Sequence, residues 1–403
     1  MALQVISPRE RYARQRAVIK PYSSLDLFPD STQDQLAAAA GNRIPLIIVI
    51  YYGGTIGMTP DERGQLVPTN DAARLLEPLS IKGLDKCVQV AWLPVYGRAI
   101  DSTNGRWVHW VSIANAIRLL YDCAAGFVVC GGTDTMAHMI AAMNFMFPNI
   151  GKPIIGAGSQ LPMFELGDDA TNNLYYAITT AAADVSGAHL AFGDELMHGL
   201  HVHKVQDRRF RAFACESRYM LGHFAGEVEL YDHCPRRNTL VNAGRLKFKP
   251  DFREGIKVVK LSPATPSESI LHDAQDPTCP VLLLITYGAG NVRDEGVIED
   301  ERMHIECLRE LYDRRYPVIL GSPMMDGKVD SPYRTGALAV STEPDGGGAI
   351  SGGDTTGPTL EVKAMIALKH ATPDDADRPD YDAFRRLMHT DFVGELNSIK
   401  PSS

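Results

Sequence analysis

A turn rich in hydroxyl groups follows a short apolar run near residue 130. Residues 127–130 are aromatic or β-branched up to the final cysteine, which is typical of a buried strand, and Gly131 and Gly132 follow them directly. Thr133 and Asp134 then open a helical stretch, since Thr and Asp are favoured at helix starts. A hydroxyl and a carboxylate beside free helix-start N–H groups could bind a polarised carbonyl or an anion. The simpler alternative is a capped turn without chemistry.

The same arrangement occurs earlier in the chain. Residues 44–52 form a second apolar run, and Gly53, Gly54 and Thr55 follow it directly. Glycines allow a tight turn and a close approach of a ligand to the backbone. Residues 59–68 are polar and rich in turn-forming residues, so they could form a mobile lid. Two strands that each end in Gly-Gly-Thr predict two threonine hydroxyls at the carboxyl edge of one sheet.

Composition and charge narrow the classes of function. The chain has 403 residues, of which 45% are hydrophobic and 22% are charged, as is typical of a globular protein with two domains. Its formal net charge is −9, so it lacks the basic surplus of a nucleic-acid-binding protein. No apolar run is as long as a membrane span. We therefore expect a small polar substrate, and neither nucleic acid nor a membrane as a partner.

Cysteine usage indicates the compartment. The seven cysteines are scattered, odd in number and without a Cys-x-x-Cys pair, which argues against a disulfide framework or a zinc ribbon. The N-terminal residues interrupt their apolar positions with charges, unlike a signal peptide. These features predict reduced thiols in a cytoplasmic protein.

Strands alternate with helices through most of the chain. Each expected strand is a continuous apolar run, which is typical of parallel α/β sheets. We predict strands at residues 44–52, 88–96, 127–130, 152–160, 188–192, 256–261, 281–287 and 318–321, and helices at residues 107–121, 136–147, 168–185 and 302–315. The basic segment of residues 198–211 is expected to be irregular.

The predicted fold is a pair of α/β domains. The larger, N-terminal domain at residues 44–245 holds a doubly wound, mainly parallel sheet, and the smaller, C-terminal α/β domain at residues 256–370 holds a second parallel sheet. Residues 1–43 form an N-terminal extension, residues 246–255 a linker and residues 371–403 a C-terminal tail.

Cofactor motifs fit the sequence poorly. A dinucleotide fingerprint that begins at Gly156 and Gly158 would need a glycine where Leu161 stands. A phosphate-binding loop of the Gly-x-x-x-x-Gly-Lys-Thr type does not occur. We therefore expect no cofactor.

Two further groups of residues leave alternatives open. His198, His201 and His203 could bind a metal ion, but no carboxylate lies at helical spacing beside them. Partly exposed loop histidines are the simpler interpretation, and we expect no metal site. Cys130 could act as a nucleophile with His138, although a strand cysteine is more often buried and inert.

Three motifs together resemble the bacterial L-asparaginase family, and most closely its cytoplasmic type I branch. They lie at residues 53–57, 132–136 and 152–160. Residues 100–104 are similar to the turn with which that branch binds the substrate carboxylate. The resemblance covers roughly residues 44–370 and implies a two-domain fold, an active site between the domains, and its completion across a homodimer or homotetramer.

The resemblance implies an amidohydrolase with a threonine nucleophile. Thr55 corresponds to the favoured nucleophile, and Lys204 falls where the family keeps its catalytic lysine. A threonine hydroxyl needs a neighbouring base, and a lysine can serve if its pKa is lowered. Asp134, next to Thr133, could orient that lysine.

The same resemblance implies residues that bind the substrate. Asp101 and Ser102, with Thr103 beside them, would hold its α-amino and α-carboxylate groups. Backbone N–H groups at the two Gly-Gly-Thr turns would stabilise the tetrahedral oxyanion. The implied binding residues are Gly54, Gln65, Asp101, Ser102, Thr103 and Gly132.

Four positions depart from the family pattern. Gln65 stands where the family keeps a lid tyrosine, and Gly131 stands where it keeps a histidine. Residues 167–170 exchange a cation for an anion at Asp168, and residues 357–358 replace a glutamate that reaches a neighbouring active site. A pocket that loses a ring and an imidazole and gains an anion is expected to admit a larger or more cationic substrate than asparagine.

Three functions follow from these observations. The first is release of ammonia from the side-chain amide of L-asparagine or a close analogue. The second keeps the scaffold but acts on another amide or on a modified amino acid. The third is a non-catalytic homologue that binds a small molecule.

Overall fold

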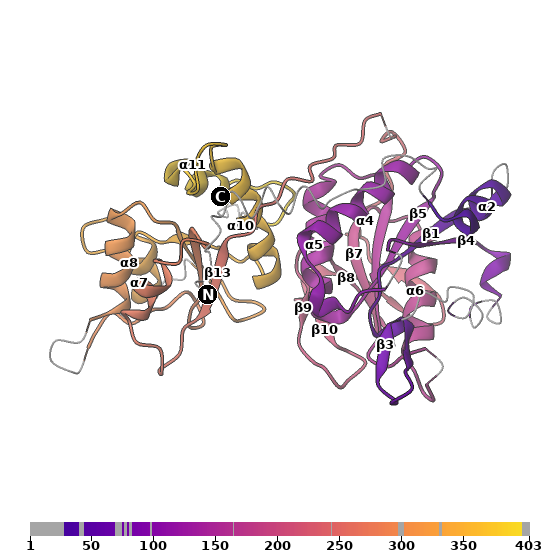
Figure 1. Ribbon diagram of the computed structural model, residues 1–403, viewed down its shortest axis with the longest axis horizontal. Helices are drawn as coiled ribbons and strands as arrows, with labels where there is room; N and C mark the ends of the chain where they lie inside the picture. The colour runs from indigo at the N-terminus through magenta and orange to yellow at the C-terminus, as the bar shows by residue number, and fades with distance from the viewer. Residues whose placement is uncertain are drawn as a thin grey trace. The chain divides into compact units, whose positions relative to one another are not determined.

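The computed structural model describes residues 28–39, 44–68, 75, 79, 83–96, 99–163, 165–242, 244–296, 302–329 and 333–396. The chain divides between Pro250 and Asp251 into two compact units. We call the described residues before this division the N-terminal unit and those after it the C-terminal unit. Each contains a sheet flanked by helices (Figure 1).

The N-terminal unit contains a sheet of eight described strands in the order β12-β11-β8-β7-β6-β5-β1-β4. The last five in this order run parallel, and the central strands are buried, as expected for strands covered on both faces. The predicted mainly parallel sheet is therefore confirmed. The strands are β1 (Leu46–Tyr51), β4 (Gln89–Pro94), β5 (Gly126–Cys130), β6 (Pro153–Ala157), β7 (Gly187–Phe192), β8 (Glu195–His198), β11 (Met220–Phe224) and β12 (Val228–Leu230).

The other end of this sheet is antiparallel. β8, β11 and β12 add to β7 by successive antiparallel pairs, and Gly193, with a φ of 64°, turns the chain from β7 into β8. Residues 198–211, predicted to be irregular, contain β9 (His203–Lys204), which pairs with β10 (Phe213–Ala214). The remainder of the segment after β8 is irregular as predicted, but β9 was not foreseen because a strand of two residues leaves no periodic pattern.

Helices cover both faces of the parallel strands. α6 packs in the same apolar cluster as Ile155, whereas Ile140 of α5 lies against Gly156 on the opposite face. Figure 1 shows α5 and α6 on either side of the sheet. The helices that the structure describes here include α2 (Asp30–Ala39), α4 (Trp107–Leu120), α5 (Met136–Met146) and α6 (Ala170–Ala182).

α2 covers the edge strand β4. The Thr32 hydroxyl donates to the Trp92 carbonyl at 2.8 Å, and the Trp92 N–H donates to the Gln35 amide oxygen at 2.8 Å. An edge strand is a template for unwanted pairing unless it is covered. Part of the expected N-terminal extension therefore docks on the sheet, whereas residues 1–27 and 40–43 lie outside the described residues.

The C-terminal unit contains a second, smaller parallel sheet in the order β13-β14-β15-β16, which confirms that part of the predicted fold. Leu282 and Leu284 pack with α8 in one cluster, and Leu283 packs with α10 and α11 in another. The elements are β13 (Ile256–Lys260), α7 (Ser269–Asp273), β14 (Val281–Ile285), α8 (His304–Asp313), β15 (Val318–Gly321), α9 (Arg334–Val340), β16 (Ile350–Ser351), α10 (Gly357–Ala371) and α11 (Tyr381–Met388).

A buried ion pair holds the end of the described chain on this unit. Lys363 of α10 and Glu395 are both fully buried, with Nζ and Oε1 2.8 Å apart. Glu395 also accepts the N–H groups of Phe392 and Val393. A buried charge needs such partners, so residues 390–396 are fixed against α10.

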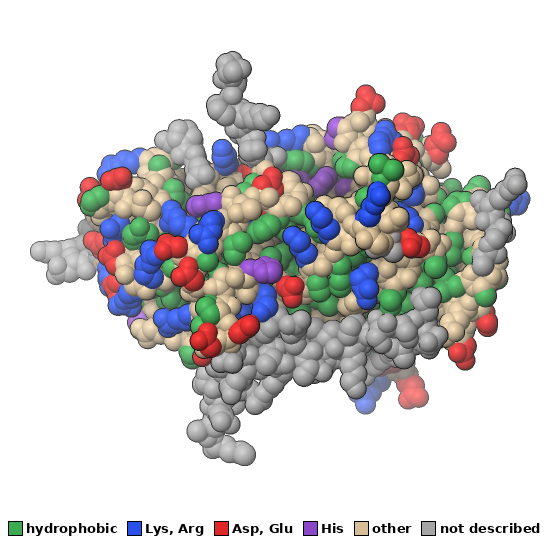
Figure 2. Space-filling view, turned by 90° about the horizontal axis from the view of Figure 1, so that it is seen from above, with side chains coloured by type: hydrophobic (Ala, Val, Ile, Leu, Met, Phe, Trp, Pro, Cys, Tyr) green, Lys and Arg blue, Asp and Glu red, His purple; other side chains and the backbone are tan. Residues whose placement is uncertain are grey.

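The surface carries charges of both signs. On the face shown in Figure 2, basic and acidic side chains of the described residues are interspersed. None of the described helices combines the length and the apolar character that a membrane crossing requires.

Three histidine rings lie together where β7 turns through β8. His198 contacts the rings of His189 and His201 at centroid distances of 5.1 and 5.3 Å, and His201 stacks on Tyr219 at 3.5 Å. Burial, followed by the neighbouring histidines, lowers the pKa of His189 and of His201 to about 3. Burial, followed by His233, lowers the pKa of His198 to about 4. The cluster is therefore neutral at pH 7.

This cluster predicts loss of stability in mild acid. An unfolded histidine has a pKa of about 6.5, so below that pH the unfolded chain binds protons that the folded chain does not. We expect the free energy of unfolding to fall between about pH 6.5 and pH 4, by up to about 1.4 kcal/mol per pH unit for each histidine. Urea unfolding across this range measures the slope.

His201→Phe keeps a ring against Tyr219 but cannot titrate, so its slope should be shallower than that of the parent protein. The exposed His272 on α7 provides the matched control, and His272→Gln should leave the slope unchanged. Equal slopes for all three proteins would show that the cluster does not contribute.

Candidate active site

The two Gly-Gly-Thr turns lie in direct backbone contact. β1 and β5 are neighbouring parallel strands in a register that sets Tyr51 opposite Cys130, so both turns leave the same edge of the sheet at the same level. A Cβ built on Gly54, where φ is 87°, would lie 2.1 Å from the backbone nitrogen of Gly132. Only glycine fits there, because any side chain would push the turns apart.

A third segment closes on these turns from β4. Gly53 forms a parallel bridge with Ile100, and the Gly54 N–H donates to the Ile100 carbonyl at 3.1 Å. Ser102 follows in a short 3-10 turn and is packed so tightly that a Cβ on Gly132 would lie 2.4 Å from its hydroxyl. Since the Gly54 N–H is already donated, it is not available to bind a substrate oxyanion.

Both threonines begin a 3-10 turn. Thr55 is partly buried at the start of η2 (Thr55–Gly57), and Thr133 is 7% exposed at the start of η5 (Thr133–Thr135). Within the described part of the chain, neither hydroxyl makes a hydrogen bond, so both are available to a substrate. The first N–H groups of such turns have no partner inside the turn, which suits them to bind a carbonyl oxygen.

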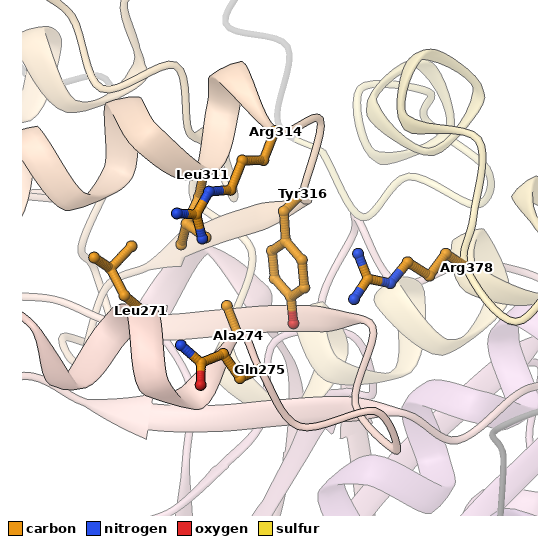
Figure 3. A pocket seen from close by; sticks show the side chains of 7 residues that line it. All are labelled: Leu271, Ala274, Gln275, Leu311, Arg314, Tyr316 and Arg378. Atoms are coloured by element: carbon orange, nitrogen blue, oxygen red, sulfur yellow. The ribbon is translucent and has the colours of Figure 1, made fainter.

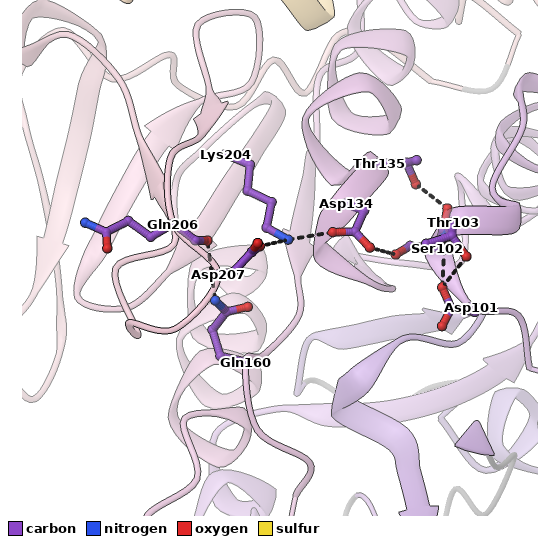
Figure 4. A network of polar contacts seen from close by, with 9 residues as sticks. All are labelled: Asp101, Ser102, Thr103, Asp134, Thr135, Gln160, Lys204, Gln206 and Asp207. Atoms are coloured by element: carbon purple, nitrogen blue, oxygen red, sulfur yellow. Dashed lines mark hydrogen bonds and ion pairs between the residues drawn. The ribbon is translucent and has the colours of Figure 1, made fainter. Parts of the chain in front are cut away.

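A chain of polar contacts runs from Ser102 to Asp207 (Figure 4). The Ser102 hydroxyl donates to Asp134 Oδ2 at 3.3 Å, and Lys204 Nζ donates to Asp134 Oδ1 at 2.6 Å. Lys204 Nζ also lies 2.7 Å from Asp207 Oδ1. The structure thus brings together Ser102, Asp134 and Lys204, which the sequence predicted, and Asp207, which it did not.

Lys204 is held between two carboxylates. Burial alone lowers the pKa of Lys204, but the hydrogen bonds and charges of Asp134 and Asp207 outweigh it, so the pKa is raised. The ammonium therefore keeps its proton in this arrangement. The condition under which a lysine readily serves as a base, a lowered pKa, is not met in this arrangement.

Lys204 reaches the site from β9. It pairs with Phe213 of β10, and the Val205 N–H donates to the Ala212 carbonyl at 2.8 Å. The Gln206 carbonyl accepts a weak hydrogen bond from the Gln160 side chain, 3.4 Å away in the loop after β6. The segment after Lys204 is thereby joined to two neighbouring parts of the unit (Figure 4).

Three of the predicted binding residues make hydrogen bonds within their own turns. Asp101 Oδ1 accepts the N–H and the hydroxyl of Thr103, at 2.9 and 2.8 Å, so these two residues stabilise their own turn. Gln65 is exposed at the turn of a hairpin, and its N–H donates to Asp61 Oδ1 at 2.8 Å. Among the described residues, its side chain makes no hydrogen bond to Thr55.

The segment around Gln65 is more ordered than a loop. β2 (Met58–Pro60) and β3 (Leu66–Pro68) pair as an antiparallel hairpin. Asp61 fixes the turn because its carboxylate accepts two backbone N–H groups. Residues 59–68, which the sequence suggests as a mobile lid rich in turns, thus belong to a hairpin that follows the η2 turn of Thr55.

Two departures from the family pattern have structural explanations. A Cβ on Gly131 would lie 2.0 Å from the Tyr52 ring, so Tyr52 fills the space beside Gly131, and the glycine at this position opens no room there for a larger substrate. Asp168 accepts the Thr171 N–H at 2.8 Å and so caps α6. Asp169 accepts the N–H groups of Gln160 and Leu161 at 3.0 Å.

The alternative chemistries receive no support from the structure. Cys130 is fully buried, and burial raises the pKa of its thiol, so it is a poor nucleophile. His138 stacks with Trp110 at 6.5 Å. Among the described residues, no group of three or more His, Cys, Asp or Glu side chains is arranged to hold a metal ion.

A separate pocket of about 240 Å³ lies in the C-terminal unit (Figure 3). Arg378 lies over the Tyr316 ring at 6.0 Å, and the Tyr316 hydroxyl donates to the Cys279 carbonyl. None of the residues predicted to act in catalysis or substrate binding lines this pocket. Its lining residues are Leu271, Ala274, Gln275, Leu311, Arg314, Tyr316 and Arg378.

Comparison with known proteins places this geometry in context. The family model described as "Asparaginase, N-terminal" matches residues 46–236. L-asparaginase 1 of Escherichia coli K12 is 31% identical over 356 residues, which cover 87% of this chain and 97% of that protein. The structure of the thermostable L-asparaginase from Thermococcus kodakarensis is similar with a TM-score of 0.73 and 28% identity, and the match covers 87% of this chain and 99% of that one.

Some relatives carry other names. The 60 kDa lysophospholipase of Mus musculus is 27% identical over 371 residues, which cover 87% of this chain and 62% of that protein. Similarity over most of the chain therefore does not by itself identify the substrate.

The contact between the turns predicts unequal effects of two glycine substitutions. Gly54 and Gly64 both have positive φ, at 87° and 75°, but a Cβ on Gly64 would meet nothing within 4 Å. Gly64→Ala should lower the free energy of unfolding only by the backbone strain, about 1–2 kcal/mol. Gly54→Ala should cost about 1–3 kcal/mol more, because it also separates the two turns. Urea unfolding measures both, and equal losses would contradict a tight contact.

Proposed function

The chain belongs to the asparaginase family, and from this membership we propose that it hydrolyses the side-chain amide of L-asparagine or a close analogue to the acid and ammonia. The observation that carries the proposal is the Ser102–Asp134–Lys204 chain beside two threonine hydroxyls that the described residues leave without hydrogen bonds. Nucleophile, base and orienting carboxylate are the parts that acyl transfer requires.

In the proposed reaction, the Thr55 oxygen attacks the amide carbon and forms an ester with the acyl group. The threonine proton passes through the base to the leaving nitrogen, which departs as ammonia. Water then attacks the ester and returns the proton to Thr55. Each attack creates an oxyanion, for which the first N–H groups of η2 and η5 are the candidate donors.

Lys204 is the proposed base, with Thr133 beside it and Asp134 as its orienting partner. The lysine must first lose a proton, since only the neutral amine can accept one. The hydrogen bond of 2.6 Å from Lys204 Nζ to Asp134 Oδ1 orients the amine. The Ser102 hydroxyl donates to the other oxygen of Asp134 and so orients the carboxylate. In this scheme Ser102 also binds the substrate carboxylate, as the resemblance of residues 100–104 implies.

We attribute the preference among amide substrates to the β2–β3 hairpin, which carries Gln65, and to the space beside Gly131. Gln65 has no phenolic hydroxyl, and Tyr52 limits the space beside Gly131. We therefore propose asparagine-sized amides as the substrate class, with the side chain of Gln65 as a source of preference among them. A cytoplasmic homo-oligomer is part of the same proposal and rests on the family resemblance.

Ammonia release from purified protein tests the proposal. A panel of L-asparagine, L-glutamine, their D-isomers and β-substituted analogues should include at least one substrate that the protein hydrolyses. A protein that binds one of these compounds without releasing ammonia from any of them would instead be a non-catalytic homologue.

Lys204→Met should lower kcat/KM on the best of these substrates by at least about 100-fold, because a general base contributes that much or more. Lys257→Met makes the same substitution at a lysine that pairs with Asp273 at 2.7 Å in the C-terminal unit, and it should leave kcat/KM within about threefold of the parent value. Similar losses in both variants would remove Lys204 from the mechanism.

A further inference from the structure

Asp207 is the second carboxylate on Lys204, and it differs from Asp134 in how firmly it is held. Asp134 lies on η5, whereas Lys204 lies on β9. Asp134 pairs with Lys204 and also accepts a hydrogen bond from the Ser102 hydroxyl. Asp207 lies on the loop between β9 and β10, is 81% exposed, and Lys204 is its only described ion-pair partner. The Lys204 side chain between them is 19% exposed.

The surroundings of this ion pair are defined by a few groups. Among the described residues, the charged groups that face Lys204 are Asp134 from η5 and Asp207 from its own loop, and Arg208 lies beside Asp207. Gln160, from the loop after β6, holds the Gln206 backbone. Further along the loop, Arg211 pairs with Asp194 at 2.6 Å. The loop is thus fixed on both sides of Asp207 by contacts that do not involve its carboxylate.

We propose that Asp207 is a positioning residue: it holds the Lys204 ammonium toward Asp134 in the resting site and must release it before Lys204 can act as a base. This inference rests on the proposed function, since it assumes that Lys204 accepts the threonine proton. Lys204 first loses a proton to solvent, and its neutral amine then takes the proton from the threonine hydroxyl.

The geometry indicates that the ion pair of Lys204 with Asp207 breaks more easily than the ion pair with Asp134. An ion pair exposed to water is weak and easily exchanged, and rotation of one exposed side chain suffices to break the Asp207 contact. Movement of Asp134 away from Lys204 would also break its hydrogen bond with the Ser102 hydroxyl. While both carboxylates remain within 3 Å, their charges favour the protonated amine, so the double pairing suits a resting state and opposes catalysis.

Asp207→Asn removes the charge but keeps a side chain of the same size. The Lys204 amine should then lose its proton at a pH lower by about one unit, as expected when one of two close opposite charges is removed. Asp207→Glu retains the charge and should behave like the parent protein. Asp194→Asn breaks the other ion pair of this segment without touching Lys204, so it is the matched control.

Lys204 can be followed without any turnover. Trace labelling of the protein with acetic anhydride between about pH 8 and pH 12, followed by mass spectrometry of the peptide that contains Lys204, reports the fraction of neutral amine at each pH. A lower midpoint in Asp207→Asn alone supports the inference. An unchanged midpoint in that variant, or an equal change in Asp194→Asn, overturns it.

The pH profile of kcat/KM on the best amide substrate separates this inference from the proposed function. The limb that reports loss of the lysine proton should move with the labelling midpoint in Asp207→Asn. Hydrolysis whose profile does not move would overturn the role of Asp207 and leave the proposed function standing. A shifted labelling midpoint in a protein that releases no ammonia would support the positioning of Lys204 by Asp207 and overturn the proposed amide hydrolysis.

Discussion

The backbone contact between Gly54 and Gly132 is the constraint on which the candidate site depends. The register of β1 and β5 brings the two turns to one level, and two residues without side chains let their backbones meet. Thr55 and Thr133 follow the touching glycines in sequence, so their hydroxyls are carried on neighbouring turns. Ser102 closes on Gly132 from the β4 side, which leaves no room for a side chain at any of these contacts.

A second feature is the balance of charge on Lys204. The sheet edge supplies Asp134, the β9–β10 loop supplies Asp207, and the two carboxylates together hold the lysine as a cation. The arrangement orients Nζ but keeps it protonated, so little of the neutral amine that a base requires is present. For Lys204 to act as the proposed base, one of its two ion pairs must open, and Asp207 is the more exposed of the two carboxylates.

Much of the fold could be predicted because the relevant patterns are local. The buried parallel strands are continuous apolar runs, and the glycine turns at their ends mark where chemistry could occur. The antiparallel strands β8, β11 and β12 could not be recognised, since they are short, partly polar and defined by their partners. The sequence offered Tyr51, Tyr52 and Tyr96 as candidates to fill the space beside Gly131, and only the fold, which brings together residues distant in sequence, shows that Tyr52 does so. Asp207 was missed because it sits in a run of arginines, and only the β9–β10 pairing turns it toward Lys204.

The proposed reaction requires that the paired turns present Thr55 as the nucleophile. Rapid mixing of the protein with its best amide substrate, acid quenching and peptide mass spectrometry would detect the acyl group on the chain. If Thr55 attacks the amide, we expect a transient ester on the peptide that contains Thr55, formed as ammonia is released. An adduct on Thr133 or Lys204 in place of Thr55 would contradict it.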